Sequence, residues 1–234
     1  MIIERIVPVP SLPRARQPYS GPVQVLSFEE VIKILDSIDR SSVLGLRDFT
    51  LFSLIYALGL RISEALGIRL EDINWSNEML LIHGKGRKQR SIPMTTKVQK
   101  MLKKWINCRK SLLNAKSSPF LFLSKRGTKL SIRMAEQSFK ETVENVGPFS
   151  LKKVTPHSLR HAFASNAVDG NADLLVLKTI LGHSSIKTTE IYLHPSIDTL
   201  KKAVNNHLAN DVIKELRSKR VGIFRIHKFK YRSG

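Results

Sequence analysis

The chain has 234 residues, enough for one large domain or two small ones, and its 42% apolar and 25% charged residues are typical of a globular protein. It carries 39 lysines and arginines against 19 acidic residues, and this net charge of +20 favours a polyanionic partner, either nucleic acid or an anionic membrane surface. No apolar stretch reaches the roughly 18 residues of a membrane span, no secretory signal is recognisable, and the single Cys108 forms no internal disulfide, so we expect a cytoplasmic nucleic-acid-binding protein.

The beginning of the chain changes character near residue 25. Residues 1–25 contain repeated prolines, which fix φ and remove backbone donors, so we expect an extended arm or linker there. A helix is predicted immediately afterwards, because Ser27 suits the N-cap and Glu30 completes a capping box. Leu26 and Val31 are spaced to form a hydrophobic staple across this helix start.

The middle of the chain changes from helical to strand-like periodicity. In residues 78–94, EMLLIHGKGRKQRSIPM, two apolar runs flank a Gly/Lys/Arg segment, which predicts a β-hairpin with a strongly basic turn at 84–90. The stretch FLFLS at 120–124 predicts a further short strand. The other expected elements are helices over 47–59, ending at Gly59, and over 61–68, 98–106, 132–145, 156–169, 172–182, 185–194 and 200–216.

These elements predict a mainly α fold with a small antiparallel β-sheet, in the α+β class. We expect an arm or linker over 1–25, one domain with a C-terminal helix over 26–216, and a basic tail over 217–234. The apolar stripe of 197–216 fits either packing against its own domain or docking on a neighbouring subunit, and the tail is either a DNA contact or a disordered end.

The decapeptide HSLRHAFASN, residues 157–166, gathers two histidines and an arginine within about one helical turn. A metal site, a hydrolase base, a solvated basic surface and a phosphate cradle are the four explanations. His157 and His161 have the i, i+4 spacing of zinc ligands, but Arg160 would repel a divalent cation, and the glutamate of the zinc-protease motif is absent. No Gly-x-Ser-x-Gly motif of a hydrolase occurs. Phosphate is favoured, because the arginine fork matches its oxygens.

Beyond this decapeptide, the chain resembles the tyrosine recombinase/phage integrase family, especially its Xer-like members. The resemblance extends from about residue 25 to about residue 205, with the motifs in the family's order and spacing. It rests on four stretches: LGLRISEALGIRLEDI (58–73), GKGRKQRSIP (84–93), HSLRHAFAS (157–165) and LGHSSIKTTEIYLH (181–194). Each motif alone is a weak signal, whereas the combination is specific.

The resemblance implies four residues around one scissile DNA phosphate. Arg61 and Arg160 bind its oxygens, His157 assists proton transfer at the nucleophile, and His183 donates a hydrogen bond to the phosphate. Taken singly, each has an ordinary alternative: an exposed arginine after a helix end, a solvated basic turn, or a histidine at a helix C-terminus. The joint match, rather than any single residue, favours the catalytic interpretation.

Two further roles complete the implied site. Tyr192 resembles the nucleophile, although a lone tyrosine on a short helix is more often a core residue. Lys85 resembles the hairpin lysine that protonates the leaving 5′-oxygen, with Lys88 as the obvious alternative. We expect the rest of the basic turn, Arg87, Lys88 and Arg90, to contact DNA.

Three neighbouring residues have less definite expectations. Glu64 and Asp72 either form ion pairs that support Arg61 or lie on a solvated face. His161 matches no catalytic position of the family, and we expect a structural role for it.

The family resemblance also implies a reaction. Tyr192 forms a 3′-phosphotyrosyl link and releases a 5′-hydroxyl, without metal, ATP or another cofactor, and a 5′-hydroxyl from a partner strand reverses the step. The implied partners are double-stranded DNA and further copies of the chain, as a tetramer that exchanges strands through a Holliday junction. Residues 1–25 stand where most relatives carry a helical clamp domain, so the resemblance implies a catalytic domain with little or no core-binding domain.

Three alternatives remain open from the sequence. A type IB topoisomerase-like relaxer would use the same chemistry without a partner site. An accessory DNA-binding protein would have lost cleavage, although all six implied catalytic residues are present. A membrane-surface protein would need an amphipathic helix, and the only candidate is the segment 95–113, where core packing is the better explanation.

Overall fold

The computed structural model describes residues 25–84, 86, 88–112, 118–149, 153–169 and 174–182. The elements in chain order are α1 (Phe28–Ser37), α2 (Val43–Leu58), α3 (Ile62–Gly67), the 3₁₀ turn η1 (Leu70–Asp72), β1 (Ile73–Asn74), β2 (Met79–His83), β3 (Gln89–Pro93), α4 (Thr96–Arg109), the 3₁₀ turn η3 (Lys110–Leu112), α5 (Ile132–Val146), α6 (Pro156–Asp169) and α7 (Leu174–Leu181). The expected helices at 185–194 and 200–216 lie outside the described residues, as do the proposed arm and tail.

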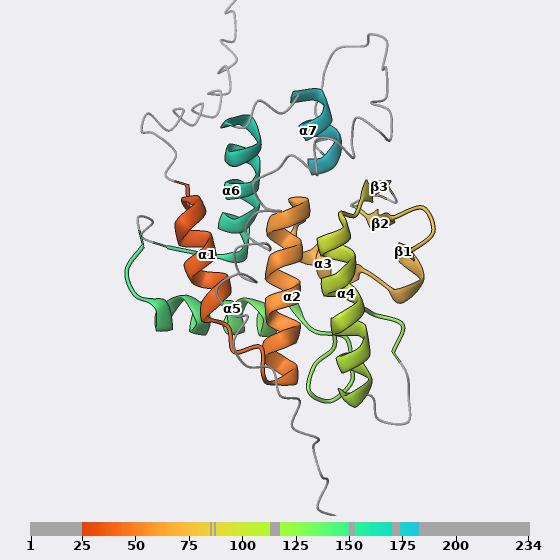
Figure 1. Cartoon of the computed structure of the whole chain (residues 1–234), viewed down its shortest axis with the longest axis horizontal. Helices are drawn as coiled ribbons and strands as arrows, with labels where there is room; N and C mark the ends of the chain where they lie inside the picture. The colour runs from red at the N-terminus through yellow and green to blue at the C-terminus, as the bar shows by residue number, and fades with distance from the viewer. Residues whose placement is uncertain are drawn as a thin grey trace, which may run out of the picture.

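Helix α2 is the centre around which the other helices pack. Every residue from Leu46 to Leu58 is buried, so this part of α2 has no solvent face, unlike the amphipathic helices α1, α4 and α5. It contacts α6 on one side and α4 on the other, with α1 and α5 also against it (Figure 1). The Phe52 and Phe139 rings meet edge to face, with centroids 4.7 Å apart, and join α2 to α5.

The start of α1 confirms the predicted capping box. The Ser27 hydroxyl accepts from the Glu30 backbone N–H at 3.2 Å, and the Glu30 carboxylate accepts from the Ser27 N–H at 2.9 Å. Leu26 and Val31, the predicted staple pair, are both buried. Helix α2 begins four residues earlier than expected because Ser42 caps it, its hydroxyl accepting from the Gly45 N–H at 3.0 Å.

The predicted hairpin is confirmed as β2 and β3, which pair in antiparallel register with Leu80 opposite Ile92. A short strand that the sequence did not predict, β1, extends the sheet to the order β1-β2-β3. Leu80, Ile82 and Ile92 are buried and turn one face of the hairpin toward the helices. The sheet therefore holds the basic turn at the side of the helical domain (Figure 1).

The stretch 120–124 does not form the predicted strand, and within the described residues it makes only isolated bridges. Side chains occupy acceptors that a strand ladder would use. Trp105 Nε1 donates to the Leu121 carbonyl at 3.0 Å, and Arg109 Nε donates to the Phe120 carbonyl at 3.0 Å. The consecutive apolar residues Leu121, Phe122 and Leu123 are buried in the core without forming a strand.

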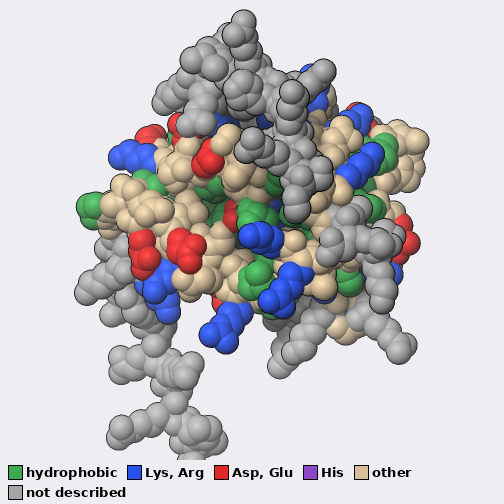
Figure 2. Space-filling model, turned by 90° about the horizontal axis from the view of Figure 1, so that it is seen from below, with side chains coloured by type: hydrophobic (Ala, Val, Ile, Leu, Met, Phe, Trp, Pro, Cys, Tyr) green, Lys and Arg blue, Asp and Glu red, His purple; other side chains and the backbone are tan. Residues whose placement is uncertain are grey.

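The surface features bear on the membrane alternative. Val98, Met101, Leu102 and Trp105 of α4 are buried, so the apolar stripe of the only candidate amphipathic segment belongs to the core. Figure 2 views the molecule from the bottom of Figure 1 and shows Lys and Arg side chains interspersed with Asp and Glu over its described part. No helix among the described residues has the length and apolar character needed to cross a membrane.

The turn after α2 yields a stability prediction. Gly59 has φ +60°, and a Cβ at this position would lie 2.5 Å from Cδ1 of Phe163. We expect Gly59→Ala to lower the free energy of unfolding by about 2–4 kcal/mol, through left-handed strain and overpacking, as measured by urea denaturation. Gly67→Ala is the matched control, because a Cβ there meets nothing within 4 Å, and equal losses in the two variants would contradict the prediction.

Candidate active site

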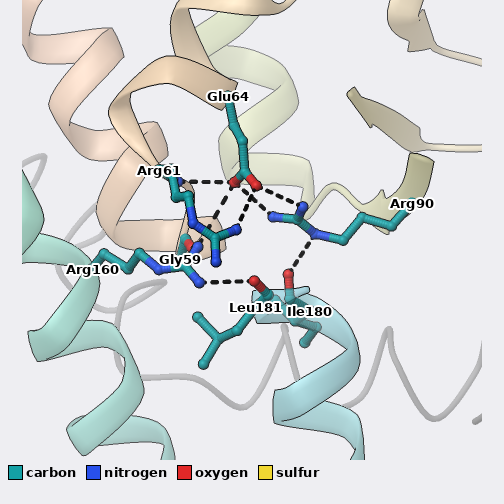
Figure 3. Close-up of polar contacts among 7 residues, drawn as sticks. All are labelled: Gly59, Arg61, Glu64, Arg90, Arg160, Ile180 and Leu181. Atoms are coloured by element: carbon teal, nitrogen blue, oxygen red, sulfur yellow. Dashed lines mark hydrogen bonds and ion pairs between the residues drawn. The ribbon is translucent and has the colours of Figure 1, made fainter. Parts of the chain in front are cut away.

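Three arginines from separate parts of the chain converge on the carboxylate of Glu64 (Figure 3). Arg61 Nη1 lies 2.9 Å from Oε1, and Arg90 pairs with both oxygens, at 3.0 Å from Nη1 and 2.8 Å from Nη2. Arg160 Nη1 lies 3.7 Å from Oε2. One carboxylate on α3 therefore connects the turn after α2, strand β3 and helix α6.

The local sequence explains how Arg61 and Glu64 come together. Gly59 ends α2 in the left-handed conformation, and α3 begins only three residues later, at Ile62. Arg61 is then the N-cap of α3, and Glu64 occupies the third helical position, from which its carboxylate accepts from the Arg61 backbone N–H at 2.9 Å. The same side chain that starts α3 thus fixes the guanidinium of Arg61.

Arg160 reaches this cluster from α6 and is held by backbone carbonyls. Its Nη1 donates to the Gly59 carbonyl at 2.6 Å, and its Nη2 donates to the Leu181 carbonyl at 2.8 Å. Burial, with smaller contributions from the positive Arg61 and Arg90, lowers the pKa of Arg160 to about 10, although Glu64 opposes the shift. The guanidinium is therefore still protonated at neutral pH, and its position is fixed from two sides.

The pKa of Glu64 reports the strength of the cluster. Burial alone would raise this pKa, but the hydrogen bonds from Arg90 and from the Arg61 N–H outweigh burial and bring it down to about 2. Glu64 is consequently ionised throughout the physiological range. One negative charge faces three positive ones, so the cluster keeps two uncompensated positive charges.

This excess charge is open to solvent at one member of the cluster. The Arg61 side chain is 45% exposed, whereas the Arg90 and Glu64 side chains are 14% and 4% exposed. An anion can therefore reach Arg61 while the other groups stay fixed beneath it. Fixed guanidinium donors beside an exposed one suit a phosphate, because their geometry needs no rearrangement when charge develops.

His157 lies on the exposed side of α6, one turn before His161. The two rings meet edge to face with centroids 4.4 Å apart. Partial burial, and then the nearby His161, Arg160 and Arg61, lower the pKa of His157 below 6.5. A neutral imidazole beside a cationic cluster is suited to accept a proton. Among the described residues, no group of three His, Cys, Asp or Glu could hold a metal ion.

The structure brings Arg61, Arg160 and His157 into one electrostatic neighbourhood. Lys88 is exposed on the hairpin, where it stays a predicted DNA contact. Arg90 is turned away from solvent toward Glu64, an arrangement that its position in a basic turn did not indicate. Four of the predicted site residues, Lys85, Arg87, His183 and Tyr192, lie outside the described residues and stay predictions.

The two carboxylates expected near Arg61 have different partners. Glu64 does pair with Arg61, as expected. The expectation for Asp72 is wrong, because this buried carboxylate accepts from the Arg69 N–H at 2.7 Å and lies 2.7 Å from Nε2 of His83. Asp72 therefore holds the end of β2 next to the basic turn and not the arginine cluster.

Most of this chain is similar in sequence to known proteins. The sequence profile described as the phage integrase family matches residues 24–198. The tyrosine recombinase XerD of Corynebacterium glutamicum is 39% identical over 180 residues, which cover 76% of this chain and 59% of that protein. A tyrosine recombinase XerC of a Mycobacterium species is 33% identical over 195 residues, covering 81% and 63%. The chain thus spans about 60% of the length of these curated relatives.

Solved structures give the same result for the fold. XerH site-specific recombinase in a post-cleavage complex with palindromic difH substrate is 26% identical, with a TM-score of 0.60 over 83% of this chain and 52% of that one. The Tn1549 transposon integrase, at 23% identity and a TM-score of 0.60, shares the fold. The described fold is thus that of a tyrosine recombinase catalytic domain. The chain belongs to the phage integrase family.

The His157 environment predicts a measurable titration. We expect an NMR titration of the His157 ring protons to give a pKa below 6.5, because burial and neighbouring cations disfavour its charged form. His161→Ala should raise this pKa toward its ordinary value, since the change removes the neighbouring ring and its Coulombic contribution. A wild-type pKa at or above 6.5, or no rise in the variant, would contradict this account.

The Glu64 cluster predicts how stability depends on pH. The folded pKa near 2 lies below the ordinary 4.5, so the stabilisation is present above pH 4.5 and is lost as pH falls toward 2. We expect Glu64→Gln to cost on the order of 3 kcal/mol at pH 7 in urea unfolding. The difference from wild type should shrink below pH 4.5.

The control for this comparison is Glu71→Gln. Glu71 also pairs with an arginine, Arg69 at 3.1 Å, but its side chain is 69% exposed, and exposed pairs contribute little. A difference between wild type and Glu64→Gln that stays constant from pH 7 to pH 3 would show that the carboxylate charge is not what stabilises the cluster.

Proposed function

We propose that this chain is the catalytic part of a tyrosine-type site-specific recombinase that breaks and rejoins DNA. The observation that carries the proposal is the cluster of Arg61, Arg90 and Arg160 around Glu64, which leaves two positive charges beside a neutral His157. Such a cluster is suited to bind one DNA phosphodiester and to stabilise the negative charge that develops on it. The family match and the similarity to curated tyrosine recombinases support the same conclusion.

In the proposed reaction, the Tyr192 hydroxyl attacks the phosphorus of one DNA phosphodiester. His157 accepts the phenolic proton, Arg61 and Arg160 stabilise the charge on the non-bridging oxygens, and the bond to the 5′-oxygen breaks. Lys85 protonates that oxygen, which leaves as a 5′-hydroxyl. The 3′-phosphotyrosyl ester retains the bond energy, so an incoming 5′-hydroxyl can reverse the step without metal or ATP. His183 would donate to the same phosphate.

The assignment of Tyr192 gains support from the tyrosine that the structure describes. Tyr56 is buried in α2, and its oxygen accepts from Nδ2 of Asn166 at 2.7 Å. Burial raises the pKa of Tyr56 to about 12, and with 1% exposure its hydroxyl is out of reach of a DNA phosphate. Tyr56 is therefore unsuited to attack DNA, and among the other tyrosines, Tyr19, Tyr192 and Tyr231, only Tyr192 lies in the family motif.

We also propose double-stranded DNA as the partner, contacted by Arg87 and Lys88, and a tetramer in which strand exchange passes through a Holliday junction. The XerH structure with difH substrate supports the choice of DNA. The net charge of +20 would supply sequence-independent affinity that weakens as salt rises. Exchange of the C-terminal helix between subunits and location in the cytoplasm belong to the same proposal, as does the division into an arm (1–25), a catalytic domain (26–216) and a basic tail (217–234).

A relaxing activity without strand exchange is the second candidate. The arginine cluster serves cleavage in either case, because both reactions pass through the same phosphotyrosyl intermediate. Strand transfer to a second duplex distinguishes them, since a relaxer rejoins only the strand that it cut. A non-cutting accessory protein is the third candidate, and it would form no covalent intermediate.

Detection of the covalent protein–DNA intermediate is the decisive experiment. On a nicked suicide duplex, the wild-type chain should form a protein–DNA adduct that survives a denaturing gel and does not depend on EDTA. Tyr192→Phe should abolish the adduct while leaving DNA affinity within about twofold, because only the attacking oxygen is lost.

Tyr231→Phe serves as the control and should form the adduct normally. An adduct that persists in Tyr192→Phe would mean that another residue is the nucleophile, and inhibition by EDTA would revive a metal at the histidines of α6. Salt-sensitive binding with no adduct in any variant would favour the accessory protein.

A further inference from the structure

Arg90 lies on the basic hairpin, but its side chain mainly contacts other parts of the protein and not solvent. Its Nε donates to the Ile180 carbonyl at 2.7 Å, while Nη1 and Nη2 form a bidentate pair with Glu64. The Arg90 side chain is only 14% exposed. A DNA phosphate would have to compete with a fixed carboxylate for this guanidinium, so a direct DNA contact is unfavourable.

The backbone at the end of α7 packs closely against the Arg90 guanidinium. Gly182 follows α7 with φ +64°, and a Cβ on it would lie 2.9 Å from Nη1 of Arg90. The positive φ favours a glycine at this position, and a side chain there would also displace the Arg90 guanidinium. Arg90 and Arg160 hold neighbouring carbonyls, Ile180 and Leu181, immediately before this glycine.

We propose that Arg90 is a positioning residue that fixes the end of α7 against the Arg61–Glu64 pair. The proposal rests on the proposed recombinase function, in which His183 directly follows Gly182 and Lys85 precedes Arg90 on the same hairpin. Through Arg90, one carboxylate would set the relative placement of β3, the first arginine and the end of α7. Arg90 would act through these groups without touching the DNA.

The substitution Arg90→Lys separates the two roles. Lysine keeps the positive charge and can still serve a phosphate as a point charge, but it cannot reproduce the bidentate pair together with the Ile180 bond. A positioning role predicts that cleavage by Arg90→Lys at saturating DNA falls on the order of 10²-fold, while its DNA affinity and salt dependence stay at wild-type values. A phosphate role predicts nearly normal cleavage for Arg90→Lys, and for Arg90→Gln a salt slope lowered by about one.

A second measurement needs no DNA. Amide hydrogen exchange of the free protein should be roughly tenfold faster at the end of α7 in Arg90→Lys, the effect expected when hydrogen bonds to a charged group are lost. Exchange in α1 should be unchanged. This readout keeps the two proposals separate: if the wild type forms no adduct, the proposed function fails, whereas exchange at α7 still decides whether Arg90 anchors this segment.

Arg40→Gln is the matched control. Arg40 is as little exposed as Arg90, at 12%, and pairs with Asp36 at 3.0 Å, but it lies after α1, away from the cluster. We expect wild-type cleavage at saturating DNA and unchanged exchange at α7 in this variant. Normal cleavage or unchanged α7 exchange in Arg90→Lys would overturn the proposal. So would failure of both Arg90 variants to fold, because Arg90 would then support the whole domain and not the site.

Discussion

The ionised carboxylate of Glu64 is the interaction on which the rest of the site depends. Its burial is costly by itself, and only the surrounding arginines make the charged form stable. In return, the carboxylate allows Arg61, Arg90 and Arg160 to approach one another despite their like charge. These arginines come from the turn after α2, from β3 and from α6. The ion pairs of Glu64 therefore also hold these distant parts of the fold together.

Features encoded by neighbouring residues were predictable from the sequence. The capping box at Ser27, the end of α2 at Gly59 and the β2–β3 hairpin all depend on local backbone preferences, and each was confirmed. The stretch 120–124 was not predictable in this way, because its backbone acceptors are taken by Trp105 and Arg109 from α4. Side-chain donors that arrive from another element leave no periodic signal in the stretch they contact.

The candidate site shows the same division. Motif spacing singled out Arg61, His157 and Arg160, which do share one neighbourhood. It gave Glu64 and Asp72 the same expected role near Arg61, and it gave Arg90 and Lys88 the same expected role in DNA contact. The two residues of each pair have the same charge and lie on similar segments. Packing makes the distinction. Glu64 faces the arginines and Asp72 faces His83, while Arg90 is only 14% exposed and Lys88 is exposed.

The anchoring of Arg160 by the Gly59 and Leu181 carbonyls has a consequence for the cluster's net charge. Both carbonyls stand at helix C-termini, where the aligned peptide dipoles concentrate partial negative charge. The two carbonyls accept hydrogen bonds that orient the guanidinium, but they bring no whole charge of their own. An ordinary ion pair both holds a guanidinium in place and neutralises its charge. The carbonyls hold the Arg160 guanidinium without neutralising it, so it can still attract an anionic ligand.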